Sequence, residues 1–121
     1  MNTRIDYYSA FEGESEINFL YTGLDGIEYS INMWIGYFDN IMGCVEPTSE
    51  GWKGLSYYYH THTGWYEHSP WQVPDMLIVL SELQTIDDLL LDPKSRKILK
   101  HICNLFAKAI QEKRYIWIHY N

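Results

Sequence analysis

Hydrophobic and polar positions near the N-terminus predict two strands. Residues 3–9 and 17–22 are rich in β-branched and aromatic side chains, which favour extended structure. The charged segment 12–16 separates these two stretches. We therefore expect the chain to begin with two strands joined by a polar connection.

The period of the apolar positions changes at residue 25. When the segment 25–46 is placed at about 100° per residue, eight apolar residues fall on one side. They are Ile27, Ile31, Trp34, Ile35, Phe38, Ile41, Met42 and Val45. On the other side, Glu28, Asp39 and Glu46 lie within about 20° of one line. This pattern predicts an amphipathic helix with an acidic stripe along its exposed face.

Residues 47–54 are rich in turn-forming residues, and residues 55–62 then alternate with a period of two. One face of this alternation carries Leu55, Tyr57, Tyr59 and Thr61. The other face carries Ser56, Tyr58, His60 and His62. The alternation predicts a strand, and the prolines of the following segment 69–74 predict a constrained loop.

A short helix is predicted after Pro74. Asp75 is placed to cap its first turn, because a carboxylate at this position accepts hydrogen bonds from free backbone N–H groups. Leu77, Leu80 and Leu83 recur at helical spacing. We expect these three leucines to form its buried side.

Asp92 and Pro93 are a stronger start signal, because a capping carboxylate precedes a proline at the first helical position. The longer helix that follows is expected to bury Ile98, Leu99, Ile102, Leu105, Phe106, Ala109 and Ile110. Its exposed side carries Lys97, Lys100, Asn104 and Lys108. Residues 115–120 are apolar on both faces and predict a final strand in the middle of the sheet, covered on both sides.

Strands and helices that alternate irregularly indicate an α+β or mixed α/β fold. We expect one domain over residues 1–121, with a single sheet and about three helices packed on it. The chain has 121 residues, of which 46% are hydrophobic and 17% aromatic, so it is able to bury a core.

The charge is strongly polarised along the chain. The formal net charge is −7 at pH 7, yet residues 1–92 carry only Arg4 and Lys53 against 15 carboxylates. The last 29 residues carry seven cations against Glu112. An acidic surface repels phosphate backbones and anionic lipids and attracts cationic proteins, so we expect neither a nucleic acid nor a membrane as partner. The alternative is that the basic end folds onto the acidic part and neutralises it.

Enzyme motifs do not stand out in the sequence. A nucleophile elbow and a glycine-rich phosphate loop are both lacking, so we expect no catalytic residue and no cofactor. Cys44 and Cys103 show no CxxC spacing and are interpreted as buried thiols. The first residues contain no apolar run of signal length, and no stretch approaches about 18 apolar residues. We therefore expect a cytoplasmic location.

His60, His62 and His68 raise the alternative of a metal site or a histidine-dependent hydrolase. On a strand, His60 and His62 would share a face, and Glu67 or His68 would have to supply a further ligand. Polar tips on an exposed strand beside tyrosines are the simpler interpretation. We therefore predict no metal ligands.

Tryptophan and tyrosine are concentrated in residues 52–71. Those expected in the core are Tyr57, Tyr59 and Trp71. Those expected at the surface, as anchors for a partner, are Tyr58, Trp65 and Tyr66. Such rings combine a large apolar face with a polar group and suit protein interfaces and sugar rings alike.

The last 70 or so residues resemble small immunity proteins of bacterial polymorphic toxin systems, including contact-dependent growth inhibition. The resemblance rests on the segments 51–55, 63–66 and 69–71 and the tyrosine-rich stretch between them, followed by a short helix, a longer helix and a final strand. It implies a cytosolic protein that binds the C-terminal domain of a toxin, often a nuclease, and blocks its active site or substrate surface. It assigns no role to any single residue.

The charge pattern predicts a stoichiometric inhibitor of a cationic partner, and the resemblance implies that this partner is a toxin domain, most simply a nuclease. The charged contacts are expected at Asp25, Glu28, Asp39, Glu46 and Glu67. The apolar anchors are expected at Tyr58, Trp65 and Tyr66. The main alternative is a non-enzymatic carbohydrate-binding or adaptor module that stacks sugars on Trp52, Trp65 and Trp71.

Overall fold

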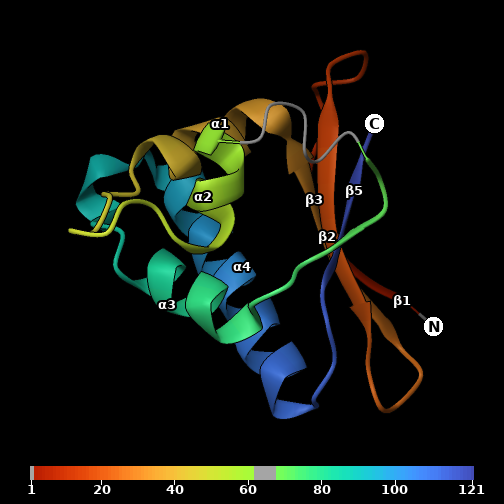
Figure 1. The fold of residues 1–121 in the computed structure, drawn as a ribbon. Coiled ribbons are helices and arrows are strands. Elements are labelled where there is room, and N and C mark those ends of the chain that lie inside the picture. The colour runs from red at the N-terminus through yellow and green to blue at the C-terminus, as the bar shows by residue number, and fades with distance from the viewer. Residues whose placement is uncertain (1, 62–67) are drawn as a thin grey trace.

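The structure is a computed structural model that describes residues 2–61 and 68–121. Its fold is α+β, with one mixed sheet whose helices gather on one side (Figure 1). In chain order the elements are β1 (Asn2–Tyr7), β2 (Glu16–Thr22), β3 (Glu28–Trp34), α1 (Ile35–Gly43), α2 (Gly54–Thr61), β4 (Trp71–Gln72), α3 (Met76–Gln84), the 3-10 helix η2 (Asp88–Leu90), α4 (Pro93–Gln111) and β5 (Trp117–Tyr120).

The strand order across the sheet is β1-β3-β2-β5-β4. β1 pairs with β3 in parallel, and the other neighbours are antiparallel. The C-terminal strand β5 lies between β2 and the two-residue strand β4. It is an interior strand, but it lies next to an edge of the sheet, and β2 occupies the middle.

One face of the sheet holds the core. Phe19 on β2 is fully buried and contacts Phe38 of α1 and Phe106 of α4, with ring centroids 5.9 and 6.2 Å apart. The other face is open, because none of the described helices lies over it (Figure 1). The expectation that β5 is covered on both sides is therefore wrong: Ile118 faces the core and is buried, whereas Trp117 is exposed.

The predicted helix over residues 25–46 is wrong in its first half. Residues 28–34 form β3, and the helix α1 runs only from Ile35 to Gly43. β3 pairs with β1 on one side and β2 on the other, so backbone pairing with distant segments decides its conformation. Ile31 and Met33 face the core two residues apart, which the helical period concealed.

The predicted strand over residues 55–62 is also wrong, because residues 54–61 form the helix α2. The preference of tyrosine for strands depends on its surroundings, and contacts with neighbouring helices override that preference here. Leu55 is buried in the core, and the Tyr59 hydroxyl donates to Asp39 on α1 at 2.9 Å. Residue 62 lies outside the described residues.

The helix α3 forms where it was predicted but with a different buried side. Met76, Val79 and Leu83 are buried, whereas Leu77 is exposed and Leu80 is half-buried. Asp75 occupies the N-cap position, but its side chain makes no capping hydrogen bond. Because every residue from 76 to 80 is apolar, the sequence does not mark which side faces inward.

The helix α4 matches its prediction closely. The Asp92 side chain accepts the backbone N–H of Ser95 at 3.1 Å, and Pro93 stands in the first turn. Six of the seven residues expected to be buried are buried, and Ile110 is half-buried. Among the described residues, none of the helices has the length and apolar character needed to cross a membrane.

Candidate functional site

Two pairs of neighbouring apolar residues are exposed among the described residues, Leu89–Leu90 on η2 and Leu77–Ile78 on α3. The η2 pair is 78% and 63% exposed, and the α3 pair also lines hollows in the surface. Leu77 is 69% exposed and its neighbour Ile78 is 45% exposed. Ile78 lines three adjoining hollows in the surface. We call these three hollows and the exposed pair together the α3 surface. Large apolar side chains grouped at a surface mark sites where another molecule binds.

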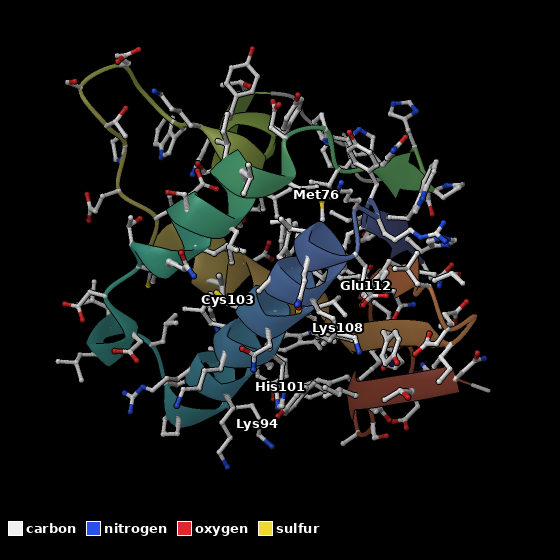
Figure 2. The ribbon with its side chains drawn as sticks, turned by 90° about the horizontal axis from the view of Figure 1, so that it is seen from below. Met76, Lys94, His101, Cys103, Lys108 and Glu112 are labelled. Carbon is white, nitrogen blue, oxygen red and sulfur yellow. The ribbon has the colours of Figure 1, made fainter. Side chains whose placement is uncertain are left out.

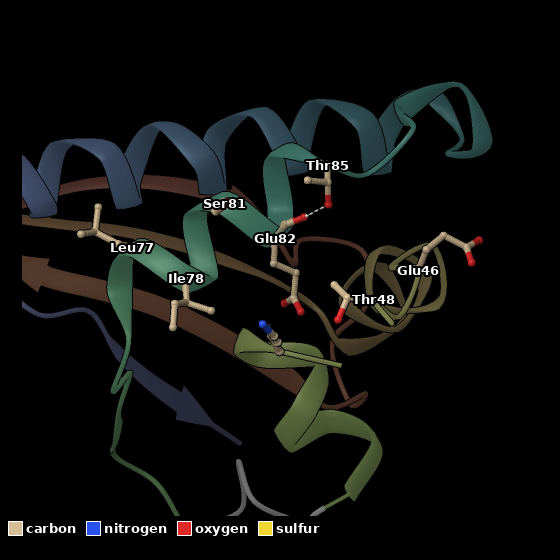
Figure 3. Close-up of a pocket in the computed structure, with 8 residues that line it drawn as sticks. Glu46, Thr48, Leu77, Ile78, Ser81, Glu82 and Thr85 are labelled. Atoms are coloured by element: carbon tan, nitrogen blue, oxygen red, sulfur yellow. Dashed lines mark hydrogen bonds between the residues drawn. The ribbon is translucent and has the colours of Figure 1, made fainter. Parts of the chain in front are cut away.

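The first hollow lies between α3 and the segment that links α1 to α2 (Figure 3). Leu77 and Ile78 form its apolar side, and Glu46 and Glu82 supply carboxylates. Its remaining lining residues are Thr48, Lys53, Ser81 and Thr85. Glu82 points toward the start of α2 in Figure 3. This hollow therefore combines an apolar side with the carboxylates of Glu46 and Glu82 and the ammonium group of Lys53.

The other two hollows extend the α3 surface in both directions from Ile78. One is aromatic and includes Trp52, Tyr57 and Tyr58. The other reaches the connection between α4 and β5, where Lys113, Arg114 and Tyr115 line it. Asp75 lines both of them. The surface thus offers aromatic and aliphatic contact area between an acidic end and a basic end.

Glu82 connects α3 to α2 beneath the α3 surface. Its carboxylate accepts the backbone N–H of Ser56 at 3.1 Å and also the Ser56 hydroxyl, in the first turn of α2. Gly54 permits the approach, because its φ is +62° and a Cβ there would lie 2.9 Å from Glu82 Oε1. Partial burial raises the pKa of Glu82 above its ordinary value, although the hydrogen bonds from Ser56 oppose that shift.

Carboxylates dominate the charge from α1 to the start of α4. In the described parts of residues 35–92, eight carboxylates face one cation, Lys53, which pairs with Glu50 at 3.7 Å. The only other ion pair among the described residues joins Arg4 to Glu16, at 3.4 Å. The cations of α4 therefore do not neutralise these carboxylates by direct pairing.

No family model, curated protein or solved structure matches the chain. The site is therefore assessed from its own geometry. Among the described residues, no group of three His, Cys, Asp or Glu side chains is arranged to hold a metal ion. His60 stacks on Trp52 with ring centroids 4.1 Å apart, whereas His62 and Glu67 lie outside the described residues.

Two of the residues predicted to contact a partner lie on the α3 surface. Glu46 lines its acidic hollow, and Tyr58 lines its aromatic hollow, half-buried against Trp71 at 5.0 Å between ring centroids. Asp39 is exposed on α1, where its carboxylate accepts the Tyr59 hydroxyl.

Other predicted contact residues lie elsewhere. Asp25 belongs to the β2–β3 turn, where it accepts the Ile27 backbone N–H at 3.0 Å and the Tyr29 hydroxyl at 2.6 Å. Glu28 begins β3, and α1 follows the far end of that strand, about 20 Å away at the usual rise per residue. The predicted acidic stripe through Glu28, Asp39 and Glu46 is therefore wrong. Trp65, Tyr66 and Glu67 lie outside the described residues.

The expected core aromatics and thiols also need correction. Tyr57 is 43% exposed, whereas Tyr59 and Trp71 are half-buried and pack against the core. Cys44 and Cys103 are free thiols, and both are half-buried rather than fully buried. Burial raises the pKa of the Cys103 thiol, which makes it less reactive.

A second polar cluster ties the end of α4 to the β2–β3 turn. Glu112 accepts the Leu24 backbone N–H and the hydroxyl of the buried Tyr21, both at 2.8 Å. These bonds lower the pKa of Glu112, and burial together with Glu112 raises the pKa of Tyr21. Lys108 lies 3.9 Å from the centroid of the Tyr29 ring. These contacts lie within the chain and explain how the turn is held.

The hydrophobic pattern does not identify Leu77, Ile78 and Tyr115 as surface residues. It predicts Leu77 in the core, because Leu77 fits a helical period with Leu80 and Leu83. The signal that could have found the pair is the unbroken apolar run of residues 76–80, which is wider than one buried side of a surface helix requires.

Proposed function

We propose that this protein is a non-enzymatic inhibitor that binds a cationic toxin domain and covers its active site or substrate surface. The observation that carries the proposal is the exposed Leu77–Ile78 pair beside the carboxylates of Glu46 and Asp75. The proposal places the partner on the α3 surface and the protein in the cytoplasm.

The apolar pair supplies the anchoring contacts. Binding energy at protein interfaces is concentrated in a few residues that become fully desolvated, surrounded by a polar rim. A partner seated on the α3 surface would cover Leu77 and Ile78, and Tyr57 and Tyr115 lie exposed on either side by 43% and 51%. A standard interface of about 1,600 Å² in total is wide enough to include these residues and the carboxylates around them.

The carboxylates supply selectivity for a basic partner. A nuclease is cationic where it grips phosphate, and an acidic inhibitor is attracted to that surface. Eight carboxylates in the described parts of residues 35–92, against Lys53 alone, support this choice of partner. Lys113 and Arg114 at the basic end of the α3 surface restrict how a cationic partner is oriented, because like charges repel.

The carbohydrate-binding alternative has less support. A sugar ring stacks on an accessible indole face, but Trp52 is already stacked with His60, and Trp71 packs against Tyr58. The aliphatic pair Leu77 and Ile78 offers no hydrogen-bonding groups for sugar hydroxyls. These contacts favour a protein as the partner.

The test begins with the neighbouring genes. We expect an adjacent reading frame for a large secreted protein with a basic C-terminal domain, and that domain is produced and assayed with the purified chain. The wild-type chain is expected to bind it and to protect cells that express it. Replacing both Leu77 and Ile78 with Asp should weaken binding by about 100-fold or more and abolish protection, because two anchors are lost.

Leu89→Asp together with Leu90→Asp is the matched control. Leu89 and Leu90 are 78% and 63% exposed on η2 and do not line the three hollows, so the same double change there should leave binding within about twofold. Circular dichroism and thermal melting establish that each variant is folded. Unchanged binding by the folded Leu77→Asp/Ile78→Asp variant would contradict this site, and absence of any binding to the neighbouring domain would contradict the function.

A further inference from the structure

The strand β1 forms one edge of the sheet, and its pairing with β3 runs without a bulge from Asn2 to Tyr7. Within the described residues, β3 is its only strand neighbour. Its six residues, Asn2 to Tyr7, include no proline, glycine or lysine, and four of them are exposed. A straight, exposed edge strand presents unpaired N–H and C=O groups that accept another strand.

The helix α4 packs beside β1 without covering its outer edge (Figure 2). Lys94 lies 5.8 Å from the centroid of the Tyr7 ring, and His101 lies beside the same ring at 5.9 Å between centroids. Both contacts are on the face of the sheet that carries the helices. The outward backbone groups of β1 therefore remain available for a further strand.

Arg4 and Asp6 lie together on the open face of β1. Arg4 Nε donates to Asn32 Oδ1 at 2.9 Å, and Asn32 Nδ2 donates to Asp6 Oδ1 at 3.2 Å. Asn32 belongs to β3 and is buried beneath these two side chains. Glu16 on β2 belongs to the same cluster and pairs with Arg4 at 3.4 Å. The edge strand itself carries one cation and one anion two residues apart on the same face.

We propose that β1 pairs with β1 of a second copy of this chain, antiparallel and around a two-fold axis perpendicular to the sheet. The axis keeps the open faces of both copies on the same side, so residues that face one another share a side of the sheet. When the axis passes beside Ile5, Arg4 of each copy lies opposite Asp6 of the other. Thr3 then lies opposite Tyr7 on the side of the helices.

The charges select this register over its neighbours. In an antiparallel pair, residues opposite one another point to the same face of the sheet, so the two-fold axis passes beside a residue and never between two residues. Moving the axis by one residue changes which charged side chains lie opposite one another. An axis beside Arg4 brings the two arginines together, and an axis beside Asp6 brings the two aspartates together. Like charges directly opposite one another destabilise a strand pair, whereas two Arg4–Asp6 pairs stabilise it.

This inference goes beyond the proposed function and does not depend on it. Figure 1 shows β1 and α3 on opposite sides of the molecule, so pairing through β1 leaves the α3 surface of each copy accessible. The dimer therefore has two identical surfaces for a partner. If the proposed function holds as well, the complex contains two inhibitor chains and two toxin domains.

Sedimentation equilibrium of the purified chain tests the pairing, at concentrations up to about 1 mM to include weak association. Salt at about 150 mM screens the repulsion between like charges more than about 8 Å apart, including the cations on the two α4 helices of the dimer. The wild-type chain should form dimers. Arg4→Asp and Asp6→Arg should each weaken dimerisation by about tenfold or more, because each places like charges opposite one another twice.

Mixing the two variants is the decisive measurement. Arg4→Asp presents two anions and Asp6→Arg presents two cations, so a one-to-one mixture should form heterodimers about as well as the wild-type chain dimerises. Glu14→Arg is the matched control, since Glu14 is exposed beyond the end of β1 and its reversal should leave dimerisation unchanged.

Circular dichroism confirms that each variant is folded before the comparison. A wild-type chain that stays monomeric at the highest concentration overturns the proposal. So do folded single variants that dimerise like the wild type, because the strand edge is then not the contact. A mixture that fails to associate overturns the register.

Discussion

The Glu82 carboxylate on α3 accepts the backbone N–H of Ser56 in the first turn of α2, 26 positions earlier in the chain. The first N–H groups of a helix have no partner within the helix, and a carboxylate near them also interacts favourably with the helix dipole. Glu82 therefore supplies from another helix the cap that α2 lacks in its own sequence. The same contact fixes α2 against α3 beneath the α3 surface.

Removing this acceptor should destabilise the fold. In Glu82→Ala the N–H of the fully buried Ser56 loses its partner, which costs about 1–3 kcal/mol. Glu82→Gln keeps an oxygen to accept that N–H and removes the half-buried charge, so it should be at least as stable as the wild type at pH 7. Urea unfolding of the three proteins measures both effects. A Gln variant as unstable as the Ala variant would show that the charge itself is required.

The pH dependence of Glu82 follows from the direction of its pKa shift. Its pKa is raised in the folded state, so the folded protein binds the proton more tightly than the unfolded chain. The stability that this group contributes is present below its ordinary pKa of 4.5 and is lost as the pH rises through the raised value. The free energy of unfolding of the wild type relative to Glu82→Gln should therefore fall over that interval. A constant difference from pH 4 to 7 would contradict the shift.

Two aspartates at helix starts provide a matched comparison of capping. Asp92 accepts the Ser95 N–H at the start of α4, whereas Asp75 makes no such bond at the start of α3. Asp92→Ala should cost about 1 kcal/mol of stability, and Asp75→Ala only a few tenths. The pKa of Asp92 is lowered by its hydrogen bonds to Ser95, so its contribution is present above its ordinary pKa and is lost as the pH falls through the lowered value. Thermal melts of both variants at neutral and acidic pH measure the difference. Equal losses of stability in the two variants would show that the side-chain hydrogen bond of Asp92 does not stabilise α4.

The cluster at the end of α4 makes a prediction for carboxyl titration. Tyr21 donates its hydroxyl to Glu112, and this bond contributes to the lowered pKa of Glu112 after the larger effect of the Leu24 N–H. Tyr21→Phe should therefore raise the pKa of Glu112 toward its ordinary value, measured by carboxyl-carbon NMR. Tyr29→Phe is the control, since Tyr29 donates to Asp25 and should shift that pKa upward instead. An unchanged Glu112 in Tyr21→Phe would contradict the assigned contact.

Local signals predicted the fold well where the segment contains its own determinants. The start of α4 is set by Asp92 and Pro93, and its buried side repeats at helical spacing, so the prediction there was correct. The general class, one sheet with helices packed on it, followed from the same kind of pattern.

Prediction failed where distant segments decide the conformation. β3 is a strand because it pairs with β1 and β2, and α2 begins where Glu82 of a later helix caps it. The α3 surface was missed for a related reason. Leu77 and Leu83 fit one helical period, and packing against the rest of the molecule decides that only Leu83 is buried. The residue types of a candidate interface were therefore visible in the sequence, but their grouping was not.

The choice of a charged surface can be tested by the kinetics of association. If a cationic partner binds the α3 surface, Glu46→Lys together with Asp75→Lys reverses the two exposed carboxylates that line its hollows. Association at low salt should slow by about tenfold or more, and the effect should shrink as salt screens the charges, while the dissociation rate changes little. Glu12→Lys with Glu14→Lys makes the same change in net charge on the exposed β1–β2 connection. Stopped-flow measurements over a range of salt compare the two variants. Equal slowing by both would assign the attraction to the net charge of the whole protein, and slowing by the second pair alone would move the interface away from α3.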